Sequence, residues 1–236
     1  MRIVELSPQL YQLSFEVGHA YLWRDADSLT LIDTGTAGSG ESIARSIKCL
    51  GLSPEDLHHV VLTHAHDDHA GAAAEIEAWG SVTVIAHRLD VPVIRGESIA
   101  TKPVFEGAPE WERKLYETKP PLPSAPPARV NRQLEEGDVL NFGGGAHVLG
   151  APGHTDGSIA LYLPKTGVLF TGDAIANVGG RTMVGVFNTE RTRAIASLHR
   201  LAELEVETAC FGHGDPIMKG ASAALRGAAK SHEATG

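Results

Sequence analysis

The sequence has little cysteine, and its two cysteines are far apart. Cys49 and Cys210 each lie inside an apolar stretch of the 236-residue chain. Small secreted domains that depend on disulfides carry cysteines at a higher density, and a chain of this length can bury a substantial core without them. We therefore expect both thiols to be reduced, buried and structural.

Long hydrophobic runs are also lacking. No stretch approaches the roughly 18 consecutive apolar residues that a membrane-spanning helix needs. The first residues, MRIVELSPQLYQLSF, lack the charged start, apolar core and cleavage site of a secretory signal. We therefore expect a soluble, cytoplasmic protein without a membrane partner.

Basic side chains are too few to suit a nucleic acid. The chain has 20 Lys and Arg against 29 Asp and Glu, a formal net charge of −9, and no basic block. Proteins that bind a phosphate backbone gather Lys and Arg on one face. We expect no nucleic-acid partner and a small-molecule substrate, and the composition does not indicate an oligomeric state.

The first half of the chain has the element order of a layered α/β protein. Two apolar runs at 21–24 and 29–32 flank the turn DADS, which favours a hairpin. A helix is predicted from Ser39, a residue type preferred at helix N-caps, to Gly51. We then predict a strand at 59–62, a helix at about 68–79 and a strand at 81–87.

Residues 96–129 interrupt this order, because they are rich in proline and contain one short helical pattern, PEWERKLY. We expect this segment to be a lid or linker within a single domain of residues 1–236. After it, strand-like runs are again followed by a helical pattern, RTRAIASLHRLAEL. The chain is therefore predicted to consist of two similar α/β halves that share one core.

Titratable residues crowd the end of one predicted strand, in VVLTHAHDDHAG at 60–71. A solvated turn with Asp67 as a helix cap would explain some of them. The spacing H-x-H-x-D-H argues for more. His64 and His66 point the same way from an extended segment, whereas Asp68 and His69 lie in the next turn and face a second point. One metal ion would suffice for the first pair of residues, and the second pair indicates a second ion.

Three further polar residues follow apolar strands in glycine-rich turns: His154 in APGHTDGS, Asp173 in LFTGDA and His213 in ACFGHGD. Taken singly, each of these segments is typical of an ordinary turn. Together with the first cluster they supply seven nitrogen and oxygen ligands, which suit zinc or a similar divalent metal.

The series LTLIDTG, THAHDDHAG, GHTDGS, TGD and FGHGD, in that order over residues 29–215, resembles the motifs of the metallo-β-lactamase superfamily. The resemblance implies an αββα sandwich of two related halves, with the metal ions at one edge between the sheets. It also implies that Asp33 does not bind a metal itself but orients the residues that do. In the implied arrangement His64, His66 and His154 hold one metal, Asp68, His69 and His213 hold the other, and Asp173 bridges them.

Such a site implies a hydrolytic mechanism with two divalent ions, for which zinc is the expected metal. The ions lower the pKa of a shared water and polarise a carbonyl or phosphoryl oxygen. On this hypothesis the bridging hydroxide attacks, and Asp68, the candidate catalytic residue, or a metal-bound water helps to pass the proton to the leaving group.

Differences between this sequence and known members of the superfamily narrow the range of reactions that it could catalyse. Glyoxalase II-like enzymes add a C-terminal helical domain, whereas only 23 residues (236 − 213) follow His213; a glutathione thioester hydrolase is therefore disfavoured. Zinc β-lactamases replace or lack the acidic bridging ligand, so hydrolysis of a β-lactam is disfavoured but stays open as an alternative. Nucleases carry an inserted domain or basic exosite, and flavodiiron proteins have Glu at the His66 position. The remaining resemblance is to compact acyl-homoserine lactonases and small thioesterases, which act on ester, lactone or thioester bonds.

Two other classes of function stay open. One is a mononuclear iron persulfide dioxygenase, in which two His and one carboxylate surround iron, and metal identity separates it from the hydrolase. The other is a non-hydrolytic member such as a biosynthetic cyclase or binding protein, which the complete set of seven ligands disfavours.

Two irregular segments that adjoin the metal motifs, 96–129 and 177–191, are the candidate substrate-binding loops. Their apolar side chains suit a small to medium neutral acyl substrate, although the aromatic residues of the first segment are equally explained by packing against the core. The predicted substrate contacts are Phe105, Trp111, Tyr116, Met183 and Phe187.

Overall fold

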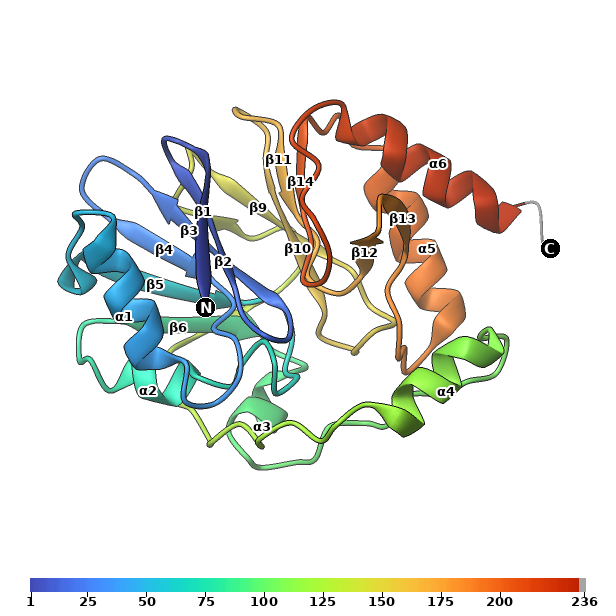
Figure 1. Cartoon of the computed structure of the whole chain (residues 1–236), viewed down its shortest axis with the longest axis horizontal. Coiled ribbons are helices and arrows are strands. Elements are labelled where there is room, and N and C mark those ends of the chain that lie inside the picture. The colour runs from blue at the N-terminus through green and yellow to red at the C-terminus, as the bar shows by residue number, and fades with distance from the viewer. Residues whose placement is uncertain (234–236) are drawn as a thin grey trace. The chain divides into compact units, whose positions relative to one another are not determined.

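The computed structural model describes residues 1–233 of the chain (Figure 1). These residues form two compact units, and neither unit is a continuous segment. Unit 1 consists of Met1–Ala100, Leu122–Glu135 and Asn141–Gly143. Unit 2 consists of Thr101–Pro121, Glu136–Leu140 and the chain from Gly144 onward.

Unit 1 is built on a seven-stranded sheet whose strands lie in chain order. Strands β1 to β4 pair antiparallel, and β4 to β7 pair parallel. Parallel neighbours need a crossover connection, so the carboxyl ends of β4, β5 and β6 meet at one edge of the sheet. The strands are β1 Arg2–Ser7, β2 Leu10–Ser14, β3 His19–Arg24, β4 Leu29–Ile32, β5 Leu57–Leu62, β6 Thr83–His87 and β7 Arg132–Leu134.

The helices of unit 1 connect these parallel strands. The predicted helix that follows Ser39 is confirmed, although the Ser39 side chain makes no capping hydrogen bond. It stops before Gly51, which has a φ of 74° and so takes the left-handed conformation that glycine tolerates. The helical elements are α1 Gly40–Cys49, the 3₁₀ turn η1 Pro54–Asp56, α2 Ala73–Glu77 and α3 Val91–Ile94.

Two local predictions in unit 1 were wrong. The helix expected at about 68–79 is only α2, because the side chain of Thr34 stabilises turns there: its hydroxyl donates to the His69 carbonyl and accepts from Ala72 N–H. Cys49 is exposed rather than buried. It lies two positions after the buried Ile47, and two residues turn a helix by about 200°.

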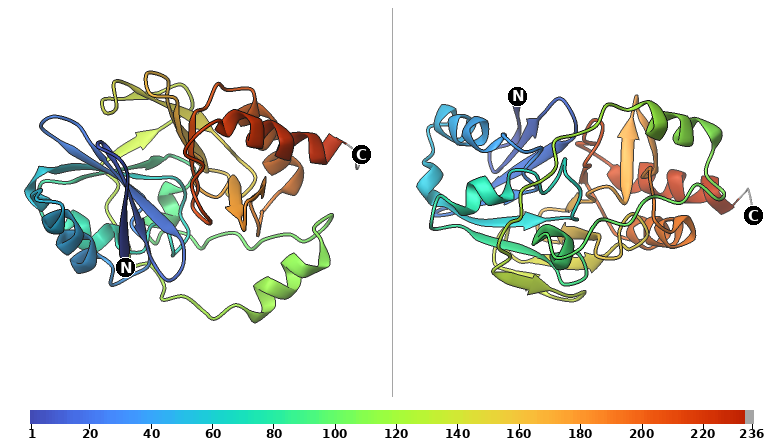
Figure 2. Two further views of the ribbon diagram at one scale, coloured as in Figure 1. Left: turned by 45° about the horizontal axis from the view of Figure 1, so that its top comes forward. Right: turned by 90° about the horizontal axis from the view of Figure 1, so that it is seen from below.

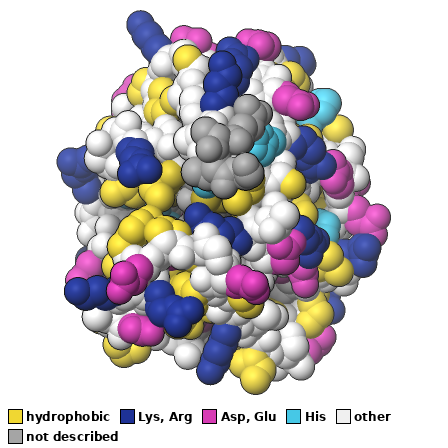
Figure 3. All heavy atoms as spheres, turned by 90° about the vertical axis from the view of Figure 1, so that its right-hand side faces the viewer, with side chains coloured by type: hydrophobic (Ala, Val, Ile, Leu, Met, Phe, Trp, Pro, Cys, Tyr) yellow, Lys and Arg dark blue, Asp and Glu magenta, His cyan; other side chains and the backbone are white. Residues whose placement is uncertain are grey.

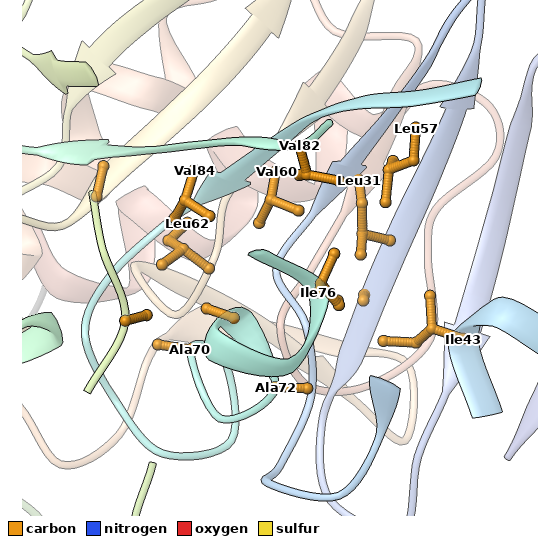
Figure 4. Close-up of a cluster of buried hydrophobic side chains, with 14 of the residues drawn as sticks. Leu31, Ile43, Leu57, Val60, Leu62, Ala70, Ala72, Ile76, Val82 and Val84 are labelled. Carbon is orange, nitrogen blue, oxygen red and sulfur yellow. The ribbon is translucent and has the colours of Figure 1, made fainter. Parts of the chain in front are cut away.

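The core of unit 1 lies between the sheet and helices α1 and α2 (Figure 4). The side chains of Leu31, Val60 and Val84 point from the strands towards Ile43 of α1 and Ile76 of α2 (Figure 4). All five are fully buried. This packing fixes the sheet edge at which the histidine-rich segment begins.

Unit 2 contains a second sheet with the strand order β14-β11-β10-β9-β8, and a separate hairpin of β12 and β13. The pair β11 and β14 is parallel, and the other pairs of the sheet are antiparallel. The strands are β8 Val139–Leu140, β9 Ala146–Gly150, β10 Ile159–Leu163, β11 Val168–Phe170, β12 Ile175–Val178, β13 Arg181–Val184 and β14 Thr208–Cys210.

Up to residue 233, unit 2 contains three helices: α4 Glu110–Thr118, α5 Arg191–Ala202 and α6 Ala221–Glu233. Helices α5 and α6 lie side by side (Figure 2). Leu198 and Leu201 of α5 and Leu225 of α6 pack in one buried cluster with Leu169 and Phe211. Helix α4 lies within the proline-rich segment and corresponds to the predicted helical pattern PEWERKLY.

The surface carries both signs of charge. Basic and acidic side chains are interspersed, with hydrophobic ones among them, over the face in Figure 3. Among residues 1–233, no helix has the length and apolar character needed to cross a membrane.

Candidate metal centre

The first candidate ligands follow β5 in unit 1: His64, His66, Asp68 and His69, here called the unit 1 cluster. The ring of His64 lies 4.2 Å from that of His69 and 4.8 Å from that of His66, between centroids. The Nε2 atom of His69 is 3.8 Å from Oδ2 of Asp68. His64 and His69 are fully buried, whereas Asp68 is 14% exposed. The structure thus brings together the four residues that the spacing singled out.

Asp33 organises this cluster from the end of the neighbouring strand. Ile32 of β4 pairs with Val61 of β5, so Asp33 reaches the residues that follow β5. Its carboxylate accepts hydrogen bonds from the Thr63 N–H at 2.7 Å, the Thr63 hydroxyl at 2.8 Å and the Nδ1 of His69 at 2.8 Å. Because Nδ1 of His69 is engaged in this way, its Nε2 is the ring nitrogen that faces Asp68.

Two further aspartates tie the segment that carries the unit 1 cluster to other parts of unit 1. Oδ2 of Asp90 accepts a hydrogen bond from Ala65 N–H, and Oδ1 of Asp67 accepts one from Ala125 N–H, both at 2.8 Å. Sequence reasoning missed the roles of Thr63 and Asp90. Asp90 immediately precedes α3, so the sequence pattern is that of an ordinary helix cap, yet its side chain makes no capping bond there.

In unit 2, the parallel pair β11 and β14 positions Asp173 and His213. Phe170 pairs with Cys210 in register, and each candidate ligand lies three residues beyond its strand's last residue. The two loops stay paired, because Gly212 N–H donates to the Gly172 carbonyl at 3.0 Å. As a result, Nε2 of His213 lies 3.2 Å from Oδ2 of Asp173.

His154 approaches the same carboxylate from the loop after β9. Its Nε2 lies 3.6 Å from Oδ2 of Asp173, and its Nδ1 donates to the carbonyl of Val186 at 3.0 Å. The preceding Gly153 has a φ of 126°, and a Cβ atom there would overlap the backbone of Ala194 in α5. We call His154, Asp173 and His213 the unit 2 cluster.

The spacing of these donor atoms fits a divalent metal. Ligand atoms bound to one zinc ion at about 2.0–2.2 Å in tetrahedral geometry lie about 3.3–3.6 Å apart. The carboxylate oxygen of Asp173 is 3.2 Å and 3.6 Å from its two neighbouring imidazole nitrogens. The chemistry is also suitable, because imidazole and carboxylate are zinc ligands and the His69 and His154 rings each have their other nitrogen hydrogen-bonded.

Three of the predicted substrate contacts meet in unit 2. The ring of Tyr116 lies 5.4 Å from that of Phe105 and 5.3 Å from that of Phe187. Trp111 projects from α4 with 47% of its surface exposed, and Met183 lies on β13 opposite Ala176. Tyr116 of the proline-rich segment therefore contacts both Phe105 and Phe187 within unit 2, whereas Trp111 remains half exposed.

Two basic side chains border these aromatic rings, a feature that the sequence analysis did not anticipate. The guanidinium of Arg113 lies 5.6 Å from the centre of the Phe105 ring. The ammonium of Lys119 lies 5.3 Å from the ring centre of Tyr116 and 5.9 Å from that of Phe187. These distances are within the range of cation–π attraction.

Comparisons with known proteins agree with this architecture. The sequence profile of the metallo-beta-lactamase superfamily matches residues 13–213. The chain is 33% identical over 205 residues to the hydroxyacylglutathione hydrolase of Rhodobacter capsulatus, a match that covers 83% of this chain and 61% of that protein. It is 28% identical to the probable metallo-hydrolase YflN of Bacillus subtilis (strain 168), over 90% of this chain and 86% of that one.

A solved structure extends the likeness to the fold. A metallo-beta-lactamase family protein of Thermus thermophilus, TTHA1429, is 28% identical, covers 98% of this chain and 80% of its own, and has a TM-score of 0.70. The predicted α/β fold class and family resemblance are confirmed. The chain belongs to the metallo-beta-lactamase superfamily.

Proposed function

We propose that this protein is a hydrolase with two divalent metal ions, zinc by preference, that cleaves an ester, lactone or thioester bond in a small acyl compound. One observation carries the proposal. Oδ2 of Asp173 lies within 3.2 Å and 3.6 Å of Nε2 of His213 and His154. The resemblance to the superfamily implies that those two histidines would hold different metals, so a carboxylate beside both would have the contacts that a bridging ligand needs.

The unit 1 and unit 2 clusters together provide the proposed ligands. All seven residues fall inside the stretch that matches the superfamily profile, which supports treating them as one centre. His64, His66 and His154 would hold one ion, Asp68, His69 and His213 would hold the other, and Asp173 would bridge the two.

When bound, divalent ions supply a water of lowered pKa and an electrophile for the substrate carbonyl. The chain's own residues prepare the site for this chemistry. Asp33 binds Nδ1 of His69, and the Val186 carbonyl binds Nδ1 of His154, so the Nε2 atoms of both rings would be the ones to bind a metal. Asp68, whose side chain is 14% exposed, would take up a proton and pass it to the leaving oxygen or sulfur.

The acyl group is proposed to lie against the aromatic side chains of unit 2, with the segment 96–129 as its cover. Phe105, Tyr116 and Phe187 form a contiguous apolar surface, and the half-exposed Trp111 adds to it from α4. Apolar walls with a few polar anchors are typical of small-molecule sites. Met183 is the remaining proposed contact.

The experiment has two parts. Elemental analysis of protein purified without added metal should find about two zinc or similar ions per chain. Turnover is then measured on a panel of an acyl-homoserine lactone, an aryl ester, an acyl thioester including a hydroxyacylglutathione, a β-lactam and a phosphodiester. The Asp173→Ala variant serves as the blank. We expect the highest kcat/KM for one of the first three compounds. One iron per chain and oxygen uptake with a persulfide would contradict the proposal, as would a tenfold preference for the phosphodiester.

A further inference from the structure

The proposed mechanism does not use Glu112, yet this residue is one of the most deeply buried acids in unit 2. It lies on α4 and is only 2% exposed. Its Oε1 accepts a hydrogen bond from Phe187 N–H at 2.7 Å, and its Oε2 accepts one from Nη1 of Arg191 at 2.9 Å. A buried carboxylate is tolerated only when paired in this way.

The two partners of Glu112 are the ends of one short stretch, residues 187–191, which leads into α5. Phe187 has a φ of 61°, a left-handed conformation that is strained for an aromatic residue. Such a conformation persists only where surrounding contacts impose it. The bond to Glu112 is one such contact, and a backbone bond from Val104 N–H to the Asn188 carbonyl at 2.9 Å is another.

The same stretch holds the loop that carries His154. Nδ1 of His154 donates to the carbonyl of Val186, the residue immediately before Phe187. Thr189 N–H donates to the His154 carbonyl at 3.3 Å, and Glu190 N–H donates to the Gly153 carbonyl at 2.9 Å. The three residues that bind the His154 loop therefore lie in or next to the stretch 187–191, whose two ends are bound by Glu112.

We propose that Glu112 is a positioning residue for metal binding, acting on His154 through the turn at Val186 and Phe187. This inference rests on the proposed function, in which His154 is a ligand. The peptide group between these two residues supplies both the Val186 carbonyl, which accepts a hydrogen bond from Nδ1–H of His154, and the Phe187 N–H, which donates to Glu112. Fixing this one peptide group fixes the tautomer and the direction of the imidazole, and such outer contacts commonly change metal affinity about 10- to 100-fold.

Two substitutions separate positioning from general stability. Glu112→Ala removes both hydrogen bonds, whereas Glu112→Gln retains an oxygen that can accept from Phe187 N–H but loses the ion pair with Arg191. Ser222→Ala is the matched control, because the buried Ser222 hydroxyl also accepts from a backbone N–H of unit 2, that of Val206, at 2.7 Å. Ser222 makes its hydrogen bonds with Leu204 and Val206, away from the His154 loop.

The first measurement is the zinc dissociation constant of the full chain, determined by competition with a chelator, alongside the thermal midpoint of each metal-free variant. We expect Glu112→Ala to raise the dissociation constant of one zinc ion about tenfold, and Glu112→Gln to raise it less. Ser222→Ala should lower the midpoint with no change in zinc affinity. If Glu112→Ala lowers the midpoint but binds zinc as tightly as wild type, the inference is overturned.

The second measurement needs no metal and therefore keeps this inference separate from the proposed function. Long-range proton–nitrogen NMR of the metal-free chain reports which ring nitrogen of His154 carries the proton. Wild type and Glu112→Gln should show the Nδ1–H form, and Glu112→Ala should show a mixture with the Nε2–H form. An unchanged His154 spectrum in Glu112→Ala overturns the inference. The expected tautomer shift in Glu112→Ala, together with a wild-type chain that binds zinc but hydrolyses none of the acyl substrates, overturns only the proposed function.

Discussion

The imidazole of His69 and the carboxylate of Asp33 are joined by a buried hydrogen bond of 2.8 Å between Nδ1 and Oδ2. Asp33 itself has a φ of 60°, a conformation that is uncommon outside glycine and its close substitutes. The same carboxylate also binds the backbone and hydroxyl of Thr63. One side chain at the end of β4 thereby fixes both the loop after β5 and the orientation of a candidate ligand.

Asp33→Asn should weaken metal binding about 10- to 100-fold. Both oxygens of the Asp33 carboxylate accept hydrogen bonds from Thr63 or His69, whereas the amide of Asn has only one oxygen that can accept. The measurement is zinc affinity by chelator competition. Asp25→Asn is the control, since the Asp25 carboxylate also accepts in unit 1, from Trp23 Nε1 and Gly143 N–H. Equal zinc affinities for wild type and Asp33→Asn would contradict the role proposed for Asp33.

Asp173→Ala should abolish turnover and lower the metal content below two ions per chain, while the metal-free protein still unfolds cooperatively. The reason is that Asp173 is the proposed bridge and adds nothing to the apolar core of unit 2. His213→Ala should chiefly deplete one ion, because its partly exposed ring is assigned to one metal only. Elemental analysis and thermal unfolding test both variants, and near-normal turnover with full metal content in either would refute the assignments.

Trp111→Ala should raise KM for the preferred substrate with a small effect on stability, because 47% of the Trp111 surface is already exposed. Tyr116→Ala is the comparison, since Tyr116 contacts both Phe105 and Phe187. It should lower the free energy of unfolding more than Trp111→Ala does. If Trp111→Ala lowers the unfolding midpoint and leaves KM unchanged across the panel, the segment packs against the protein without covering the substrate.

His59 should make the folded state less stable in acid. Burial, and then the charges of His58 and Arg132, lower the pKa of His59 below its ordinary value of 6.5. The unfolded chain therefore binds more protons than the folded one as the pH falls below about 6.5, so stability is lost on acidification. Denaturant unfolding of metal-free His59→Gln should show a smaller loss between about pH 7.5 and about pH 5 than wild type; an identical loss would argue against this effect.

The two thiols should react at very different rates. Cys49 is exposed and Cys210 is buried, and burial raises the pKa of the Cys210 thiol because it disfavours the thiolate. A thiol reagent should therefore label one cysteine per folded chain quickly and the second only after denaturation. Cys49→Ser should remove the fast phase, and its persistence in that variant would show that Cys210 is accessible.

The candidate ligands could be predicted from sequence because their spacing follows the strands directly. His64 to His69 come just after β5, and Asp173 and His213 come three residues after two paired strands. The shortness of α2 could not be predicted, because it depends on the hydroxyl of Thr34, more than 30 residues away. Glu112 was missed for the same reason: its partners Phe187 and Arg191 are 75 and 79 residues further along the chain.

The hydrogen bonds of Glu112 also limit how the sequence of residues 101–121 can vary among relatives of this protein. A loop transplanted at 101–121 that lacks Glu112 would remove both the carboxylate that pairs with Arg191 and the acceptor of the Phe187 N–H. Exchange of the two stretches together keeps each charge and each strained residue with its counterpart. Natural variation at positions 112, 187 and 191 should therefore be concerted, and chimeras that respect this grouping should fold where single-loop grafts fail.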